Sequence, residues 1–326
     1  MDGISGLTAA MLVCGLAFGF GYSANQGGTC LVLAADELHR RRRPRMLVAF
    51  LAASCSAGLV AVPLVWSETT AATLAASTGF SVPLLVGAAA FGVGALVNDT
   101  CILGSLARLG DGEIRLAAVP VGLTAGIVLV DDVLVERSAP WSSVLAKPSM
   151  LGVASLAVFG VGLILALAFV SRKEPTRPKG TWGLGLSMLL LGASGGALYA
   201  IAPAWHFVNL LHRDLPDAMP SGAEMGAWAM AFSTGGAFAA SLRRGKLRLR
   251  RPSAADTIRS LVGGTLMGAG VALIPGGNDG LLVAAIPALS PGGAAAYVLM
   301  TLTIVLGLVL RGWFRRRFTQ VASPSR

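Results

Sequence analysis

The chain has 326 residues, of which 54% are hydrophobic and only 13% are charged, and its mean hydropathy is +0.71. A soluble domain needs about a quarter of its residues to be charged, so this composition excludes a water-soluble globular protein. The net charge of +10 does not indicate nucleic-acid binding, because the basic residues form short runs between apolar segments, which is the topology signal of a membrane protein.

Apolar runs long enough to cross a hydrocarbon core of about 30 Å recur along the whole chain. In chain order the expected crossings are 5–22, 46–66, 80–97, 116–133, 149–171, 181–203, 225–242, 257–275 and 293–311. The sequence therefore predicts an all-α polytopic membrane protein with nine transmembrane helices in a single transmembrane domain.

The distribution of basic residues predicts the orientation. Lys and Arg fall almost entirely in alternate loops, 23 of the 26 on one side and 3 on the other. Cytoplasmic loops carry the excess of Lys and Arg, so the N-terminus is expected outside and the C-terminus in the cytoplasm. This arrangement fits multi-pass insertion in the inner, or plasma, membrane.

Four segments between the crossings are too apolar for loops and too short to span. Gly and Pro bound them, so we expect re-entrant half-helices, which survive at membrane depth only where protein or a watery path surrounds them. These segments are Tyr22–His39, Val97–Leu106, Ala204–Leu211 and Pro275–Pro291.

A Gly-rich pattern precedes three of these segments, at 18–21, 91–94 and 267–270, with a weaker copy near 191–196. Internal repeats with broken helices are a common transporter device, and they predict repeat halves of about 1–171 and 181–317. A cytoplasmic linker at 172–180 would join the halves, and 318–326 would form a cytoplasmic tail. The alternative explanation is that Gly-x-Gly simply permits close packing of membrane helices.

The segment Gly92–Gly110, with Cys101 followed by Gly-Ser and Ala-Arg-Leu-Gly, resembles the YeeE/YedE sulfur-transport family. The Gly19–Cys30 loop and the Gly263–Asn278 segment resemble two further loops of that family. The resemblance implies an inner-membrane transporter of thiosulfate or a related small sulfur-containing anion, in some members with a cytosolic TusA-like sulfur carrier. The family's C-terminal loop usually carries a cysteine, whereas this chain has Asn278 and Asp279, which puts a three-cysteine relay in doubt.

Cys30 and Cys101 are the strongest candidates for the substrate path, because each is expected to begin a short helix. A helix N-terminus favours an anion and favours thiolate over thiol. The alternative is two small buried residues, and packing is the preferred interpretation for Cys14 and Cys55.

Asp99 and Asp279 are expected at membrane depth, where a carboxylate is costly and usually functional. They are candidates for proton coupling, with N-capping of the half-helices as the equal alternative. The remaining polar candidates for the path could instead satisfy the backbone of the turns. They are Gly28, Thr29, Asn98, Thr100 and Asn278, together with Asn25 and Gln26.

Other features have simpler explanations. Arg108 is expected to be a cytoplasmic topology anchor or a step in anion exit, and Trp205, His206 and His212 are expected at the outer interface. The arginine runs could attract lipid or an acidic carrier protein. No cofactor or metal motif is present, so a transporter is favoured over an enzyme. A membrane sulfur transferase and a subunit that only docks a partner remain the alternatives.

Overall fold

A computed structural model describes residues 2–67, 72–131, 140–172, 180–205 and 220–321. The described residues are mostly helical. Their only β-type backbone pairings are two isolated bridges, which join Ser77 with Trp141 and Glu113 with Arg250. The longer helices are α1 (Asp2–Gly27), α3 (Arg45–Trp66), α4 (Val82–Asn98), α6 (Ala118–Asp131), α7 (Met150–Ser171), α8 (Leu184–Ile201), α10 (Pro220–Arg243), α11 (Ala254–Leu273) and α13 (Pro291–Val321). The shorter ones are α2 (Leu31–Arg41), α5 (Ile102–Gly110), η1 (Ile114–Ala117), η2 (Pro203–Trp205), α12 (Asn278–Gly280) and η3 (Leu281–Ala285). The predicted all-α fold is confirmed.

The predicted crossings all coincide with helices, but not all of these helices are long and apolar enough to span on that basis alone. Six helical runs of the described residues qualify, and the pair of α11 with α12 and η3, bent by 47° at its break, makes up to seven. Helix α6 is short, with 14 residues. Nine crossings and the orientation therefore stay predictions.

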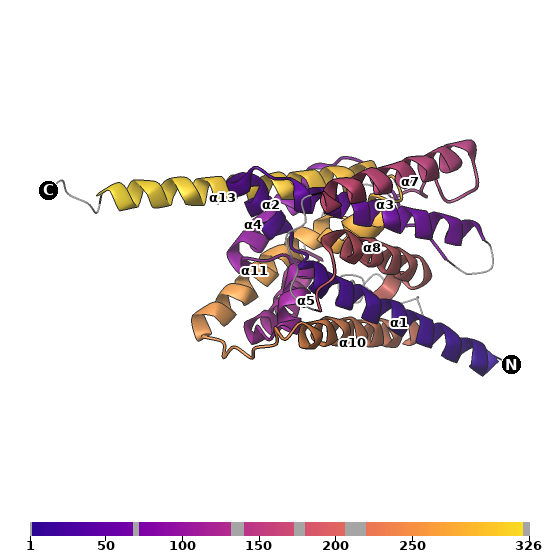
Figure 1. Cartoon of the computed structure of the whole chain (residues 1–326), viewed down its shortest axis with the longest axis horizontal. Helices are drawn as coiled ribbons and strands as arrows, with labels where there is room; N and C mark the ends of the chain where they lie inside the picture. The colour runs from indigo at the N-terminus through magenta and orange to yellow at the C-terminus, as the bar shows by residue number, and fades with distance from the viewer. Residues whose placement is uncertain (1, 68–71, 132–139, 173–179, 206–219, 322–326) are drawn as a thin grey trace.

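The helices form one bundle whose axes run roughly along its length (Figure 1). Helix α11 packs between α4 and α6, α3 packs between α7 and α8, and α1 contacts α10 and α8. Helix α1 begins at one end of the bundle and α13 projects from the other end (Figure 1). The short helices α2 and α5 start inside this bundle, so their N-termini are surrounded by protein.

The glycine motifs lie where helices touch. A Cβ atom on Gly94 would lie 2.6 Å from the backbone nitrogen of Met267, and one on Gly270 would lie 2.6 Å from the backbone nitrogen of Phe91. Glycine at these two positions lets the backbones of α4 and α11 approach directly, as small residues do in membrane helix pairs. Close packing therefore accounts for these Gly-x-Gly motifs, and the repeat halves stay a prediction.

Three helices are broken at turns that require left-handed backbone. Gly28 (φ 59°) separates α1 from α2, Asp99 (φ 60°) separates α4 from α5, and Gly276 (φ 103°) separates α11 from α12. These breaks fall in three of the four segments expected to be half-helices. Of the fourth segment, only 204 and 205 lie in the described structure, in η2, and His206 and His212 are outside the described residues.

Candidate functional site

The three broken helices meet at a pair of cysteines. Cys30 precedes α2 and Cys101 precedes α5, and their Sγ atoms are 3.9 Å apart. Both side chains are buried, with exposed fractions of 2% and 0%. The sequence analysis expected each cysteine at a half-helix start, and the structure places both there and in mutual contact.

Three N–H groups converge on the Cys101 sulfur. The backbone N–H of Leu31 lies 3.3 Å from Cys101 Sγ, that of Gly104 lies 3.5 Å away, and the side-chain Nδ2 of Asn278 lies 3.4 Å away. Each donor belongs to a different half-helix, α2, α5 or α12. Because N–H groups at helix N-termini attract negative charge, this arrangement suits a sulfur atom carrying negative charge, whether a thiolate or the sulfur of a bound anion.

Asn278 uses only one end of its amide. The side chain is 3% exposed, and its Oδ1 atom has no hydrogen-bond partner in the described structure. Nitrogen and oxygen of an amide are assigned from their hydrogen bonds, but turning this amide over would still leave one end on Cys101 and the other without a partner. A buried polar atom without a partner is costly, so this end of the amide marks a place for a ligand: one that donates a hydrogen bond to the oxygen or, with the amide turned over, an anion that accepts one from the nitrogen.

Thr100 belongs to the same site, while its neighbours support the turn. The Thr100 hydroxyl lies 3.4 Å from Cys30 Sγ. Asn98 Nδ2 donates to the Thr100 carbonyl (3.1 Å) and to the Ser105 hydroxyl (3.2 Å), so this amide holds the start of α5. The Asn98 side chain also accepts a hydrogen bond from Arg115, 3.4 Å away.

The first turn is fixed in a similar way. The Thr29 hydroxyl donates to the Ala24 carbonyl, 3.0 Å away, and so closes the end of α1 rather than facing the sulfurs. A Cβ atom added at Gly28 would meet open space, so glycine is needed here for its positive φ and not for room.

The two aspartates differ in their surroundings. Asp99 is partly exposed at the C-terminal end of α4, where it pairs with Arg259 and, at 2.9 Å, with Arg311. Asp279 is buried within α12, next to Asn278. The N-cap interpretation is wrong for both, because Cys101 caps α5 by accepting the Gly104 N–H and Gly277 occupies the N-cap of α12.

Several other candidates lie away from the cysteine pair. Arg108, in the last turn of α5, pairs with Glu113, 2.9 Å away, and its role as a topology anchor or a step in anion exit stays a prediction. Cys55 packs with Val62, Leu145 and Phe159 in a separate apolar cluster, and Cys14 is half-buried in α1.

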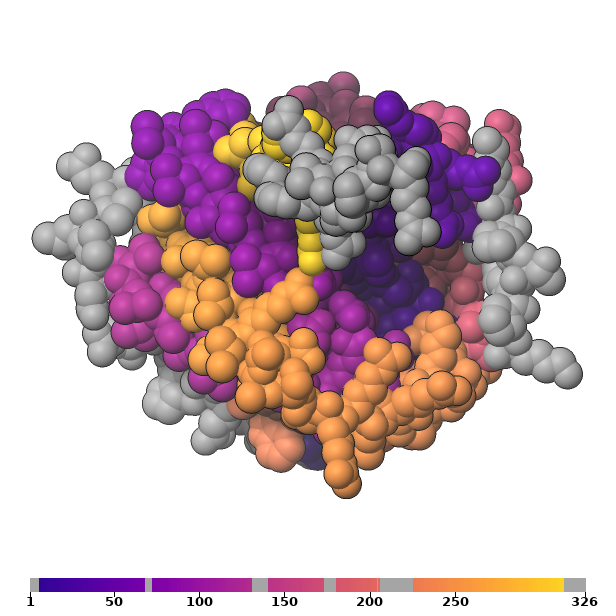
Figure 2. Space-filling view, turned by 90° about the vertical axis from the view of Figure 1, so that its left-hand side faces the viewer, coloured from indigo at the N-terminus to yellow at the C-terminus, as the bar shows by residue number. Residues whose placement is uncertain are grey.

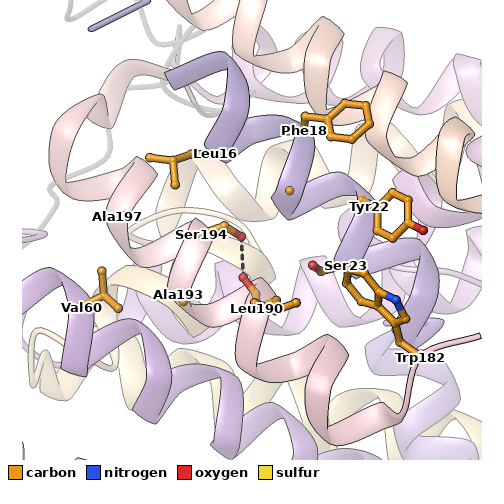
Figure 3. Close-up of a pocket in the computed structure, with 11 residues that line it drawn as sticks. Leu16, Phe18, Tyr22, Ser23, Val60, Trp182, Leu190, Ala193, Ser194 and Ala197 are labelled. Carbon is orange, nitrogen blue, oxygen red and sulfur yellow. Dashed lines mark hydrogen bonds between the residues drawn. The ribbon is translucent and has the colours of Figure 1, made fainter. Parts of the chain in front are cut away.

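A pocket separate from the cysteine pair is lined mostly by apolar residues of α1, α3 and α8. It has a volume of about 600 Å³, and Tyr22 and Trp182 lie together at one end, with ring centroids 4.8 Å apart (Figure 3). One of its polar side chains is already hydrogen-bonded within its own helix, since the Ser194 hydroxyl donates to the Leu190 carbonyl at 2.6 Å (Figure 3). A pocket of this chemistry suits an acyl chain better than an anion, so the cysteine pair is the better anion site.

Sequence reasoning missed the backbone donors and one side chain. The N–H groups of Leu31 and Gly104 have no signal in residue type, although their location at helix starts was expected. Arg244 counted only as a cytoplasmic charge, yet its side chain is buried and contacts both Asn25 and Asp111. Nothing in the local sequence distinguishes it from the neighbouring arginines.

The helical bundle with several membrane-capable helices and interrupted helices around a buried polar centre defines a multi-pass membrane protein of the transporter class. The family model for sulphur transport matches residues 26–306, and the chain belongs to this family, that of the YeeE/YedE proteins. The match includes all three helix breaks, at Gly28, Asp99 and Gly276. A comparison with curated proteins found no match.

Proposed function

We propose that the protein carries thiosulfate, or a closely related sulfur-containing anion, across the cell inner membrane, and that Cys30 and Cys101 line its path. The observation that carries this proposal is the convergence of three half-helix N–H donors on Cys101 Sγ. Discontinuous helices whose N-termini point at an anionic group are a recurrent transporter site.

The contacts suggest how such an anion is held. The terminal sulfur of thiosulfate is soft and accepts weak S–H hydrogen bonds, which the thiols of Cys30 and Cys101 can donate. Its oxygens need N–H and O–H donors, which the backbone turns and the Thr100 hydroxyl can supply. These contacts are individually weak, and a path for passage requires binding that is easily reversed.

Asp279 is the better candidate for proton coupling. It is buried beside Asn278, whereas Asp99 is neutralised by two arginines and partly exposed. Because its carboxylate pairs with Arg259 of α11 and Arg311 of α13, Asp99 is suited to fixing α4 against these two helices.

One observation favours a second candidate function. Three donors on a single sulfur would also stabilise the thiolate that sulfur transfer requires. In that reaction the Cys101 thiolate attacks the outer sulfur of thiosulfate, the S–S bond of thiosulfate breaks, and sulfite leaves with the bonding electron pair. The resulting persulfide on Cys101 would pass to a cytosolic TusA-like carrier. Membrane lipid, with an acyl chain in the apolar pocket, is a further partner in either case.

Uptake of radiolabelled thiosulfate into cells without other importers tests the primary proposal. We expect the double variant Cys30→Ala with Cys101→Ala to reduce uptake at least about ten-fold, because both sulfur contacts to the anion are lost. A ten-fold loss corresponds to about 1.4 kcal/mol of binding free energy, which two lost contacts can account for. The matched control is Cys14→Ala with Cys55→Ala, which removes two thiols outside the site and should leave uptake within two-fold.

Normal uptake by the Cys30 and Cys101 double variant, at equal protein level in the membrane, would overturn the cysteine path. Intact-mass spectrometry after exposure to thiosulfate separates the two functions. A gain of one sulfur atom that disappears in Cys101→Ala favours transfer, while an unchanged mass alongside normal uptake favours transport.

A further inference from the structure

Arg244 follows the C-terminal end of α10 and holds two other helices together. Its Nη2 atom lies 2.6 Å from Asn25 Oδ1 and 3.0 Å from Asp111 Oδ1. Asn25 in turn donates to the Asp111 carboxylate at 2.9 Å and to the Ala107 carbonyl at 2.7 Å. These contacts form a closed cluster between α1, α5 and the segment after α10.

The cluster is close in sequence to both cysteines. Asn25 lies in the last part of α1, just before the turn to Cys30, and Asp111 directly follows α5, the helix that Cys101 caps. The segment after α10 is also paired by its backbone, since Arg248 N–H donates to the Asp111 carbonyl and Arg250 N–H donates to the Gly112 carbonyl, both at 3.0 Å. Arg244 therefore fixes α5 relative to α1 at the positions that flank the cysteine pair.

The Arg244 guanidinium is buried but not saturated. The side chain is 5% exposed, and its Nε atom has no hydrogen-bond partner in the described part of the chain. A guanidinium group that is largely removed from water needs compensating acceptors, and Arg is well suited to bidentate binding of oxyanions. The single carboxylate of Asp111 leaves an N–H available for such a ligand.

The surroundings carry excess positive charge. Arg244 belongs to a group of arginines, here called the arginine collar, whose ion pairs within the described residues go to three carboxylates, those of Asp99, Asp111 and Glu113. The collar consists of Arg108, Arg115, Arg244, Arg250, Arg259 and Arg311. Figure 2 faces this end of the bundle, where the segment after α10, in orange, crosses the lower half of the surface beside α5 in purple. Six cations against three anions give a net charge of about +3, which favours small anions over cations here.

We propose that Arg244 is a second binding site, for a small inorganic oxyanion such as thiosulfate or sulfate, and that the bound anion competes with Asp111. An anion on the guanidinium takes over the hydrogen bond now made to Asp111 and so loosens α5 from the segment after α10, while the Asn25 bonds between α1 and α5 stay. Anion binding at Arg244 does not depend on transport. A role for this site in releasing the transported anion at the arginine-collar end of the bundle rests on the proposed function.

Equilibrium binding of labelled thiosulfate to the purified full-length protein in detergent tests the site. Cys30→Ala with Cys101→Ala serves as the background, so that the cysteine pair does not contribute. In that background we expect saturable binding that Arg244→Gln weakens at least ten-fold. Arg243→Gln removes the same charge from an exposed neighbour and should change the dissociation constant by less than two-fold.

Asp111→Asn gives a test in the opposite direction. It keeps an acceptor oxygen but removes the competing charge, so the anion should bind at least five-fold more tightly. Equal binding by the Arg244→Gln and Arg243→Gln variants would overturn the site, as would weaker binding by Asp111→Asn. If Arg244→Gln does not fold, as judged by its thermal midpoint, the Asp111→Asn result decides alone. Loss of uptake with this binding intact would instead count against the proposed function.

Discussion

Asn98 and Asn278 form a natural pair of substitutions, because both are buried asparagines beside a half-helix and only one is fully hydrogen-bonded. Asn98→Ala removes bonds to the Thr100 carbonyl, the Ser105 hydroxyl and the Arg115 guanidinium. At about 0.5–1.5 kcal/mol net for each bond, the loss in free energy of unfolding is roughly 2–4 kcal/mol.

Asn278→Ala should behave differently. It removes one contact to Cys101 Sγ, which costs about 0.5–1 kcal/mol because sulfur is a weak acceptor. It also removes an Oδ1 atom that is buried without a partner in the described structure, which relieves roughly 1–3 kcal/mol. The small cavity that remains costs about 1 kcal/mol, so the net change lies near zero.

The assay combines stability with transport. Unfolding of the purified variants in detergent gives the stability, and labelled thiosulfate uptake gives the activity. We expect Asn98→Ala to be destabilised, and Asn278→Ala to keep wild-type stability while losing at least about ten-fold in uptake, as a ligand contact would. The reasoning is refuted if Asn278→Ala is destabilised as much as Asn98→Ala, or if it transports normally.

Three further predictions concern the packing and charges around the site. Mild oxidation with copper–phenanthroline should form a disulfide between Cys30 and Cys101, whose sulfurs are 3.9 Å apart, and mass spectrometry of the digested protein should find this cross-link. A disulfide that involves Cys14 or Cys55 instead would contradict the geometry. Gly94→Ala should destabilise the protein by about 1–3 kcal/mol through overpacking against α11, whereas Gly15→Ala, with open space around its Cβ, should be neutral or slightly stabilising, so equal thermal midpoints would refute the contact. Asp279→Asn should abolish stimulation of uptake by an inward proton gradient in vesicles, while Asp99→Asn should retain it and lose only about 1 kcal/mol of stability; the reverse pattern would reassign the coupling residue.

Local sequence was sufficient to locate the helices and three of their breaks, because apolar length and Gly or Asn turns are local signals. It also located both cysteines at helix starts. It did not predict that Asp99 ends α4 in a left-handed conformation instead of capping α5, and it could not predict that the Asp99 carboxylate pairs with Arg259, which is 160 positions away. The meeting of Leu31 and Asn278 at one sulfur likewise depends on the packing of three helices that are distant in sequence.

Cys101 Sγ accepts the Gly104 N–H and thereby caps α5, although cysteine is not a usual cap. A passing anion whose oxygen accepts the Gly104 N–H must compete with the Cys101 sulfur for that N–H. An N-cap contributes about 1 kcal/mol, so the competition lowers the affinity for cargo about five-fold. When the anion departs, the helix end closes again on its own. Re-forming the cap hydrogen bond therefore favours release of the anion and keeps its residence time short.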